Sequence, residues 1–137
     1  ASENARFGSV FIRRGLVPDS GASFFLPRLV GTARTLELMY TGDVIDAAEA
    51  ERIGLVNRVV PAEELMAATR ELAERIAKGP PIALALTKRL VYRWLEQDIM
   101  AQLEYEAYQQ SLCRQTDDFK EGVRAFQEKR EPEFKGK

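Results

Sequence analysis

The chain has 137 residues, of which 45% are hydrophobic and 30% charged, and its formal net charge is −1. These values are typical of one globular domain with a real core, and they argue against a nucleic-acid surface, which needs clustered Lys and Arg, and against a membrane span. The sequence has no histidine and one cysteine, Cys113, which excludes a His-based triad, a Cys/His zinc cluster and an intrachain disulfide. We therefore expect no metal, a packing role for Cys113 and a cytoplasmic protein.

The first elements in chain order are short. Residues 1–15 contain brief apolar runs broken by glycines, which predicts a strand end and a loop rather than a helix. The turn Pro18–Gly21 precedes a short helix that ends near residues 29–31, and Asp19 or Ser20 is placed to cap that helix.

Three further short elements follow. A helix is predicted over residues 32–40 and is closed by Gly42. Another is predicted over residues 47–53, with Asp46 as its cap. Residues 55–60 are predicted to form a brief strand.

From residue 61 onward the pattern is helical. Apolar residues recur three or four positions apart in successive segments, which breakers such as Gly79-Pro80-Pro81 separate. The predicted helices cover residues 62–78, residues 82–95, a segment that begins at Asp98, and a last segment capped by Thr116–Asp118. The apolar face of the last helix is Phe119, Val123 and Phe126, and residues 135–137 form a polar tail.

Two regions follow from this order, residues 1–60 with the short strands and residues 61–137 with the longer helices. The first region has too few strands to build a sheet, and a single strand is not stable alone. We therefore expect further strands from a chain segment outside this sequence, as in a truncated longer protein.

Three stretches of the sequence carry a family pattern. They are Ala1–Gly8 with Gly15–Gly21 and Leu26–Gly31; Leu38–Gly42 with Ala48–Ala50, Gly54–Asn57 and Val59–Pro61; and Asp118–Arg130 with Pro132 and Phe134–Gly136. In this order and spacing, they resemble the C-terminal part of the crotonase (enoyl-CoA hydratase/isomerase) superfamily.

The resemblance implies an α/β crotonase-like fold, in which a ClpP/crotonase-type spiral of ββα turns is followed by helices. Residues 1–60 would be the end of the spiral and one wall of the active site. Residues 61–137 would be the helical oligomerisation region of a homo-trimer or of a dimer of trimers. Most of the CoA-binding surface would lie upstream, as would both N–H donors of the oxyanion hole, which stabilises the thioester enolate.

Two positions bear on the chemistry that the resemblance implies. Hydratases of the family have a catalytic glutamate where this sequence has Phe11, which cannot transfer a proton. Isomerases that work through an aspartate place it at the position of Asp19, and Gly15–Gly21 looks most like the isomerases of phenylacetate degradation. One carboxylate that reaches two carbons can shift a double bond, whereas water addition favours two groups. Asp19 is thus the candidate catalytic residue, although an aspartate in such a turn is commonly a cap.

The neighbours of Asp19 in the sequence are apolar. Leu16, Val17 and Phe24, together with Phe11, are the candidate lining of the substrate pocket. Phe11 is equally well explained as a core residue.

Phe126 and Lys129 match a position at which the final helix of the family reaches the CoA of a neighbouring subunit. The resemblance implies that the ring contacts the adenine and the ammonium a phosphate. The alternative is that Phe126 belongs to the apolar stripe of the last helix and Lys129 is a solvated charge.

The leading hypothesis is a CoA-thioester double-bond isomerase that takes the thioester as substrate and needs no separate cofactor. A hydratase or hydrolase of the same family, with its carboxylate upstream, is the first alternative. A non-catalytic assembly module is the second. A membrane-surface helix is discarded, because glutamates on the polar face of residues 62–78 have the wrong sign for anionic lipid.

Overall fold

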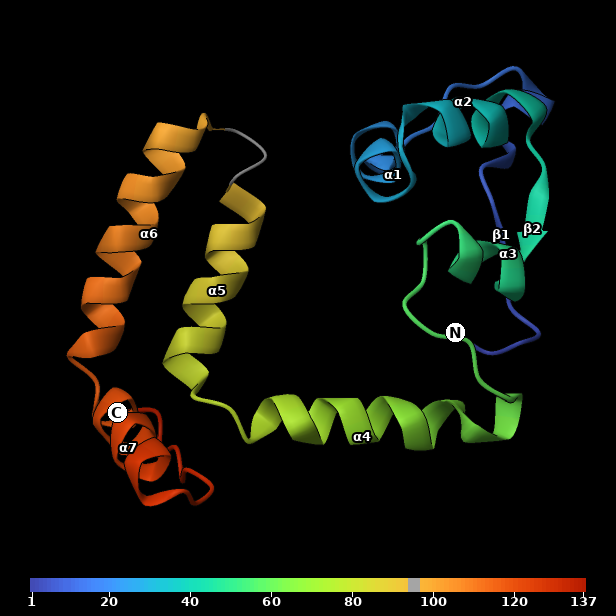
Figure 1. The fold of residues 1–137 in the computed structure, drawn as a ribbon. Helices are drawn as coiled ribbons and strands as arrows, with labels where there is room; N and C mark the ends of the chain where they lie inside the picture. The colour runs from blue at the N-terminus through green and yellow to red at the C-terminus, as the bar shows by residue number, and fades with distance from the viewer. Residues whose placement is uncertain (94–96) are drawn as a thin grey trace. The chain divides into compact units, whose positions relative to one another are not determined.

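The computed structural model describes residues 1–93 and 97–137 (Figure 1). The chain divides into two compact units, Ala1–Arg70 and Glu71–Lys137. Each unit is described by itself. The predicted division into a spiral end and an oligomerisation region concerns the roles of the parts and stays a prediction.

The first unit contains a two-stranded antiparallel ladder. Strand β1 (Arg6–Gly8) pairs with strand β2 (Val44–Asp46), with Phe7 opposite Ile45. The strand predicted near the start of the chain is therefore confirmed. No sequence pattern indicates β2, because three residues are too few to show an alternation.

The strand predicted over residues 55–60 is wrong. The backbone N–H groups of Leu55 and Val56 both donate to the carbonyl of Ala50, at 2.8 and 3.3 Å, so the segment wraps around the end of a helix. The N–H of Val59 donates to the Glu51 carboxylate at 2.9 Å. With these donors engaged, only Val60 forms an isolated bridge, to Ser2.

The helices of the first unit differ from the prediction mainly at their beginnings. The loop predicted after β1 contains a short 3₁₀ helix, η1 (Val10–Arg14), which ends at Gly15 with φ of 68°. Helix α1 (Ala22–Val30) begins after Gly21 and has no side-chain cap, so the cap predicted at Asp19 or Ser20 is wrong. The N–H of Ala22 donates instead to the backbone carbonyl of Asp19, at 2.9 Å.

The next two helices are confirmed. Helix α2 (Thr32–Thr41) ends at Gly42, whose φ of 66° is the left-handed conformation that glycine adopts without strain. Helix α3 (Ala47–Arg52) is capped by Asp46, whose carboxylate accepts the N–H of Glu49 at 2.9 Å. The buried apolar side chains of this unit come from these two helices and are Leu38, Met39, Ala47 and Ala50.

The helical part of the chain follows the predicted order. The short 3₁₀ helix η2 (Ala62–Glu64) leads into α4 (Leu65–Ala77), and Gly79-Pro80 separates α4 from α5 (Pro81–Arg93). The predicted end of α5 at Leu95, with Trp94 in its stripe, lies outside the described residues. As predicted, α6 (Ile99–Arg114) begins at Asp98, which caps it, and α7 (Asp117–Glu128) is capped by Thr116, the first of the three residues that the sequence offered as caps.

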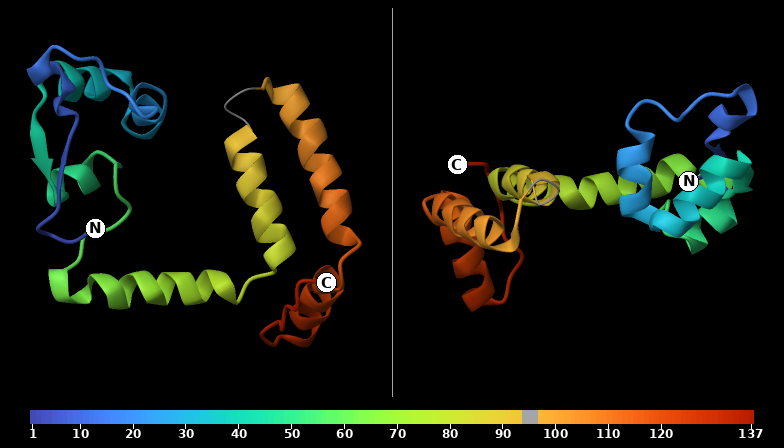
Figure 2. Two further views of the ribbon diagram at one scale, coloured as in Figure 1. Left: turned by 180° about the vertical axis from the view of Figure 1, so that it is seen from behind. Right: turned by 90° about the horizontal axis from the view of Figure 1, so that it is seen from above.

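Helices α5 and α6 form a hairpin, and the views in Figures 1 and 2 both show them side by side. The buried Gln102 of α6 donates to the carbonyl of Leu90 at 3.3 Å, and the guanidinium of Arg93 lies 4.0 Å from the ring centre of Tyr105. Within residues 1–93 and 97–137, no helix has the length and apolar character that a membrane crossing requires. The predicted cytoplasmic location stays a prediction.

The apolar stripe predicted for α7 is not a core in this chain. Phe119, Val123 and Phe126 are 44%, 43% and 86% exposed. The buried face of α7 instead contains Asp118 and Ala125, at 4% and 1% exposure. The reason is that the residues after α7 return along this face, which the periodicity of α7 alone does not reveal.

Candidate functional site

The loop that carries Asp19 joins η1 to α1. Asp19 is exposed, and its carboxylate accepts a hydrogen bond from the Ser20 hydroxyl at 2.9 Å. Ser20 and Gly21 both have positive φ, at 53° and 78°. A serine in the left-handed region is uncommon, and such strain concentrates at functional sites. The turn thus presents a carboxylate with its own hydrogen-bond donor at the beginning of a helix.

Aromatic side chains gather on α1 beside this turn. The rings of Phe24 and Phe25 meet edge to face with centres 5.2 Å apart, and the Arg28 guanidinium lies 3.6 Å from the centre of the Phe24 ring. Arg28 also donates to the carbonyl of Phe24 at 2.7 Å. A Cβ atom on Gly21 would lie only 3.1 Å from the Phe25 ring, so the turn packs closely on this cluster.

The other predicted pocket residues lie before the turn. Phe11 is half-buried in η1, and its carbonyl accepts the N–H of Leu16 at 3.2 Å. Leu16 and Val17 are 55% and 82% exposed, and Phe24 is 38% exposed. The hydrogen bond links Phe11 with Leu16, and Phe24 belongs to the α1 cluster. Their contact with a substrate stays a prediction.

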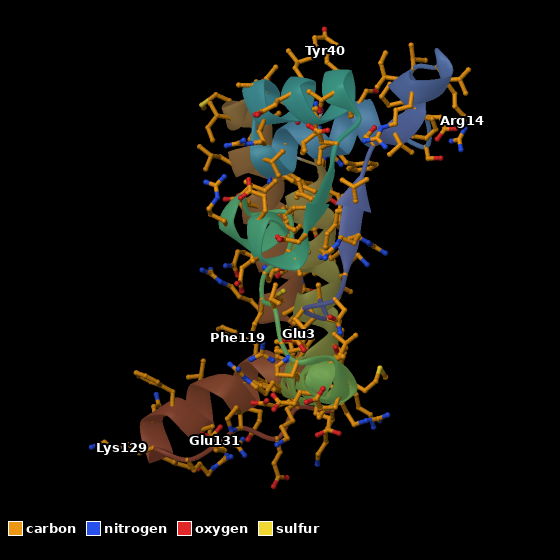
Figure 3. All side chains as sticks on the ribbon, turned by 90° about the vertical axis from the view of Figure 1, so that its right-hand side faces the viewer. Glu3, Arg14, Tyr40, Phe119, Lys129 and Glu131 are labelled. Carbon is orange, nitrogen blue, oxygen red and sulfur yellow. The ribbon has the colours of Figure 1, made fainter. Side chains whose placement is uncertain are left out.

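Phe126 and Lys129 both lie at the C-terminal end of α7, in the second unit. Phe126 is 86% exposed, and Lys129 terminates the helix with φ of 55°, in the left-handed region. Figure 3 shows Lys129 and Glu131 at the end of α7 that is opposite to Phe119. The exposed ring and the ammonium are available to a partner molecule.

The chain after Lys129 folds back along α7 and is held by acidic side chains of that helix. Glu121 accepts two hydrogen bonds from the Arg130 guanidinium, at 2.6 and 3.0 Å, and one from the N–H of Glu133 at 3.1 Å. Together these donors lower the pKa of Glu121 from 4.5 to about 2, with Arg130 as the largest cause. Asp118 accepts the N–H groups of Lys135 and Gly136, at 2.6 and 2.9 Å.

A groove of about 730 Å³ lies in the second unit, between α5, α6, α7 and the returning chain. Its lining is mostly apolar and includes Leu86, Cys113, Val123 and Phe134. The buried Gln109 also lines it, and its Oε1 atom has no hydrogen-bond partner within the described residues. In the part of the chain that the structure describes, no group of three or more His, Cys, Asp or Glu side chains could hold a metal ion.

The sequence and the fold both match known proteins. The pattern of the family described as "Enoyl-CoA hydratase/isomerase" matches residues 1–137. The chain belongs to the enoyl-CoA hydratase/isomerase family. The predicted crotonase superfamily membership and crotonase-like fold are thereby confirmed.

Individual members of the enoyl-CoA hydratase/isomerase family are similar over nearly the whole chain. A crotonyl-CoA hydratase of Syntrophomonas wolfei is 42% identical over 134 residues, which are 98% of this chain and 52% of that protein. A short-chain-enoyl-CoA hydratase of Clostridioides difficile is 40% identical over 92% of this chain and 81% of the relative.

Solved structures of the enoyl-CoA hydratase/isomerase family give the same result. An enoyl-CoA hydratase of Bacillus anthracis matches with a TM-score of 0.96 and 39% identity, over 100% of this chain and 53% of that one. The chain therefore spans about half the length of most of the relatives described here.

Sequence reasoning missed several features of these sites. It assigned no role to Arg28, although the i, i+4 spacing of Arg28 from Phe24 was a usable signal for their contact. It assigned Asp118 to capping, whereas the carboxylate of Asp118 binds the returning chain. No local pattern could have revealed that contact, because the partners are 17 and 18 residues apart.

Proposed function

We propose that this chain supplies the acid/base carboxylate, Asp19, of an enzyme that shifts the double bond of an enoyl-CoA thioester. The proposal rests on the residues that occupy two positions of the family pattern, Phe11 and Asp19. Phe11 stands where the hydratases of the family have a glutamate, and Asp19 stands where the aspartate-dependent isomerases have their acid. The exposed Asp19 carboxylate, with the Ser20 hydroxyl as donor, is consistent with that role.

The chemistry needs a single carboxylate. Moving a double bond removes a proton from one carbon of the acyl chain and returns it to another, so one base that reaches both carbons completes the cycle. The Ser20 hydroxyl, which donates to Asp19 at 2.9 Å, would hold the carboxylate in one orientation. The thioester oxygen, on which charge develops, would be stabilised by backbone N–H donors that the family resemblance assigns to another part of the protein.

The binding surfaces follow from the same proposal. Leu16, Val17 and Phe24 would contact the acyl chain and exclude water, and Phe11 would close the pocket where a second carboxylate would otherwise activate water. Phe126 and Lys129 would contact the adenine and a phosphate of CoA. The family resemblance further implies a homo-trimer or a dimer of trimers, in which that CoA belongs to a neighbouring subunit.

The second candidate function is hydration of the double bond. The names of the relatives favour it, since the similar proteins from Syntrophomonas wolfei and Clostridioides difficile are both called hydratases. A hydratase that contains Phe11 would rely on a carboxylate from outside this chain. Asp19 would then be a turn residue without a role in proton transfer.

The substitution Asp19→Asn in the complete gene product tests the proposal. We expect the turnover of a 3-enoyl-CoA to its 2-enoyl isomer to fall by about 10²–10⁴-fold, the usual contribution of a general acid/base. Hydration of a 2-enoyl-CoA is measured on the same preparations. If the parent protein and the Asp19→Asn variant both hydrate the 2-enoyl-CoA rapidly, the second candidate function is established and the first is excluded.

Asp43→Asn is the matched control. Asp43 is an exposed carboxylate of the same unit, 67% exposed and 4.0 Å from the Arg13 guanidinium. Its removal changes the net charge as Asp19→Asn does. We expect no loss of isomerisation, and an equal loss in both variants would trace the effect to charge or folding rather than to Asp19.

A further inference from the structure

The end of α7 is held in place from both sides of Lys129. On the helical side, Ala125 is 1% exposed, and its carbonyl accepts the N–H of Arg130 at 3.1 Å. On the other side, the Arg130 guanidinium is anchored to Glu121 by two hydrogen bonds, of 2.6 and 3.0 Å. We call this doubly hydrogen-bonded ion pair of Arg130 with Glu121 the fork. The side chain of Glu121 is only 18% exposed, so the fork is better shielded from solvent than an ordinary surface ion pair.

The anchored segment includes Lys129, whose backbone is in the left-handed conformation. Lys129 has φ of 55°, and the N–H groups of Lys129 and Arg130 donate to carbonyls of the last helical turn, at 3.3 and 3.1 Å. Glycine is the residue that favours a helix end of this kind. A lysine in this conformation, next to the ion-paired Arg130, is a backbone outlier of the kind that concentrates at functional sites.

Arg130 also changes the charge around Lys129. Besides the Glu121 fork, its guanidinium donates to the Glu128 carboxylate at 2.7 Å. Two carboxylates near the lysine are thus paired with one cation. An anion that approaches Lys129 would otherwise meet the repulsion of both.

We propose that Glu121 and Arg130 are positioning residues for the recognition of the nucleotide end of CoA. They fix the Lys129 ammonium and the Phe126 ring outward, and Arg130 offsets part of the negative charge of Glu121 and Glu128 that would oppose a phosphate. This inference rests on the proposed function, in which Phe126 and Lys129 contact CoA. It goes further by assigning roles to two residues that do not themselves touch the substrate.

The test compares two thioesters of one acyl group, an enoyl-CoA and the matching enoyl-pantetheine, which lacks the nucleotide. In the complete gene product, Glu121→Gln is expected to raise the KM for the enoyl-CoA about tenfold, the size of one hydrogen bond to a charged group. For the enoyl-pantetheine, we expect Glu121→Gln to leave both the kcat and the KM unchanged. A general loss of structure would instead change the kinetics of both thioesters, and would overturn the positioning role.

Two further variants separate the possible failures. Lys129→Ala tests the underlying proposal that α7 recognises CoA. If this variant keeps the preference for the enoyl-CoA over the enoyl-pantetheine, α7 does not recognise CoA. If Lys129→Ala lowers that preference and Glu121→Gln does not, the positioning role alone is wrong. Arg130→Lys, which keeps the charge but loses the fork, covers the case in which Glu121→Gln does not fold. It is expected to lower the preference, and an unchanged preference there would also overturn the inference.

The matched control is Asp117→Asn on the same helix. Asp117 pairs with Lys120 at 2.8 Å, and both side chains are more than half exposed, at 71% and 64%. This variant removes one acid and one ion pair from α7 and keeps the backbone hydrogen bond, of 2.6 Å, from the N–H of residue 117 to the Lys137 carbonyl. We expect both thioesters to keep their KM, and a change equal to that of Glu121→Gln would attribute the effect to net charge.

Discussion

Lys129 has a backbone conformation that most side chains disfavour. Its φ of 55° places it in the left-handed region, where a side chain costs about 1 kcal/mol relative to glycine. We predict that Lys129→Gly raises the free energy of unfolding by up to about 1 kcal/mol, as measured by urea denaturation. The same variant should lose affinity for CoA. A destabilised Lys129→Gly variant would show that the lysine side chain supports the fold, contrary to the role assigned to it.

Glu121 makes the stability depend on pH at the acid end. Its pKa falls from 4.5 to about 2 in the folded chain, chiefly because of the Arg130 fork. A lowered pKa means that the folded state binds fewer protons than the unfolded state, so its contribution to stability is present above 4.5 and is lost as the pH falls towards about 2. Between about pH 5 and about pH 3, the urea-unfolding free energy should fall less in Glu121→Gln than in the parent chain. Equal slopes would mean that the fork does not persist in solution.

At the level of single residues, the candidate acid was predictable from the sequence, but the backbone conformation and the hydrogen bond beside it were not. Pro18–Gly21 marked a turn, and the family pattern singled out Asp19. The left-handed Ser20 and its hydrogen bond to Asp19 were not predictable, because serine ordinarily occupies such a position as a cap. The role of Arg130 was not predictable either, since it lies beyond the end of α7 and its partner Glu121 is nine residues away.

Among the secondary-structure elements, the helix caps were the most predictable feature. The cap predicted at Asp19 or Ser20 is wrong, but Asp46 and Thr116 accept backbone N–H groups as predicted caps. Their signal is local, since one polar side chain and the next three residues determine it. Strand β2 was missed because its three residues are too few to show an alternation, and residues 55–60 were mispredicted because their N–H groups bond to the end of α3.

Thr116 supports two helices at once. Its hydroxyl accepts the N–H of Phe119 at 3.1 Å and donates to the carbonyl of Cys113 at 2.7 Å, so it joins the end of α6 to the beginning of α7. We predict that Thr116→Ala lowers the free energy of unfolding by about 1–2 kcal/mol, measured by urea denaturation. Thr116→Ser keeps the hydroxyl and should recover most of the loss. A Ser variant as unstable as the Ala variant would assign the effect to the methyl group.

At the scale of the molecule, the described residues form only a small buried apolar core. In residues 1–93 and 97–137, the buried hydrophobic side chains are Leu38, Met39, Ala47, Ala50 and Ala125, and no large side chain is fully buried. Large apolar side chains such as Val17 and Phe126 are more than 80% exposed. Since the chain spans about half the length of most of the relatives described above, we expect other parts of the protein or of its assembly to cover much of this surface.

That expectation is measurable with a hydrophobic dye. Residues 1–137 produced alone should bind 8-anilinonaphthalene-1-sulfonate strongly and unfold with low cooperativity, because little apolar surface is removed from water. The complete gene product should bind little dye under the same conditions. Weak binding by residues 1–137 alone would mean that the exposed side chains are covered within this chain or by its own copies.

Cys113 gives the apolar groove a natural reporter. It is the one cysteine of the sequence, and it lies half-buried in the groove between α5, α6 and α7. Every thiol signal from this chain therefore comes from that groove, without any engineered label. The rate at which a small thiol reagent modifies Cys113 measures how long the groove stays open to solvent. A rate that falls when subunits assemble or CoA binds would identify which event closes it.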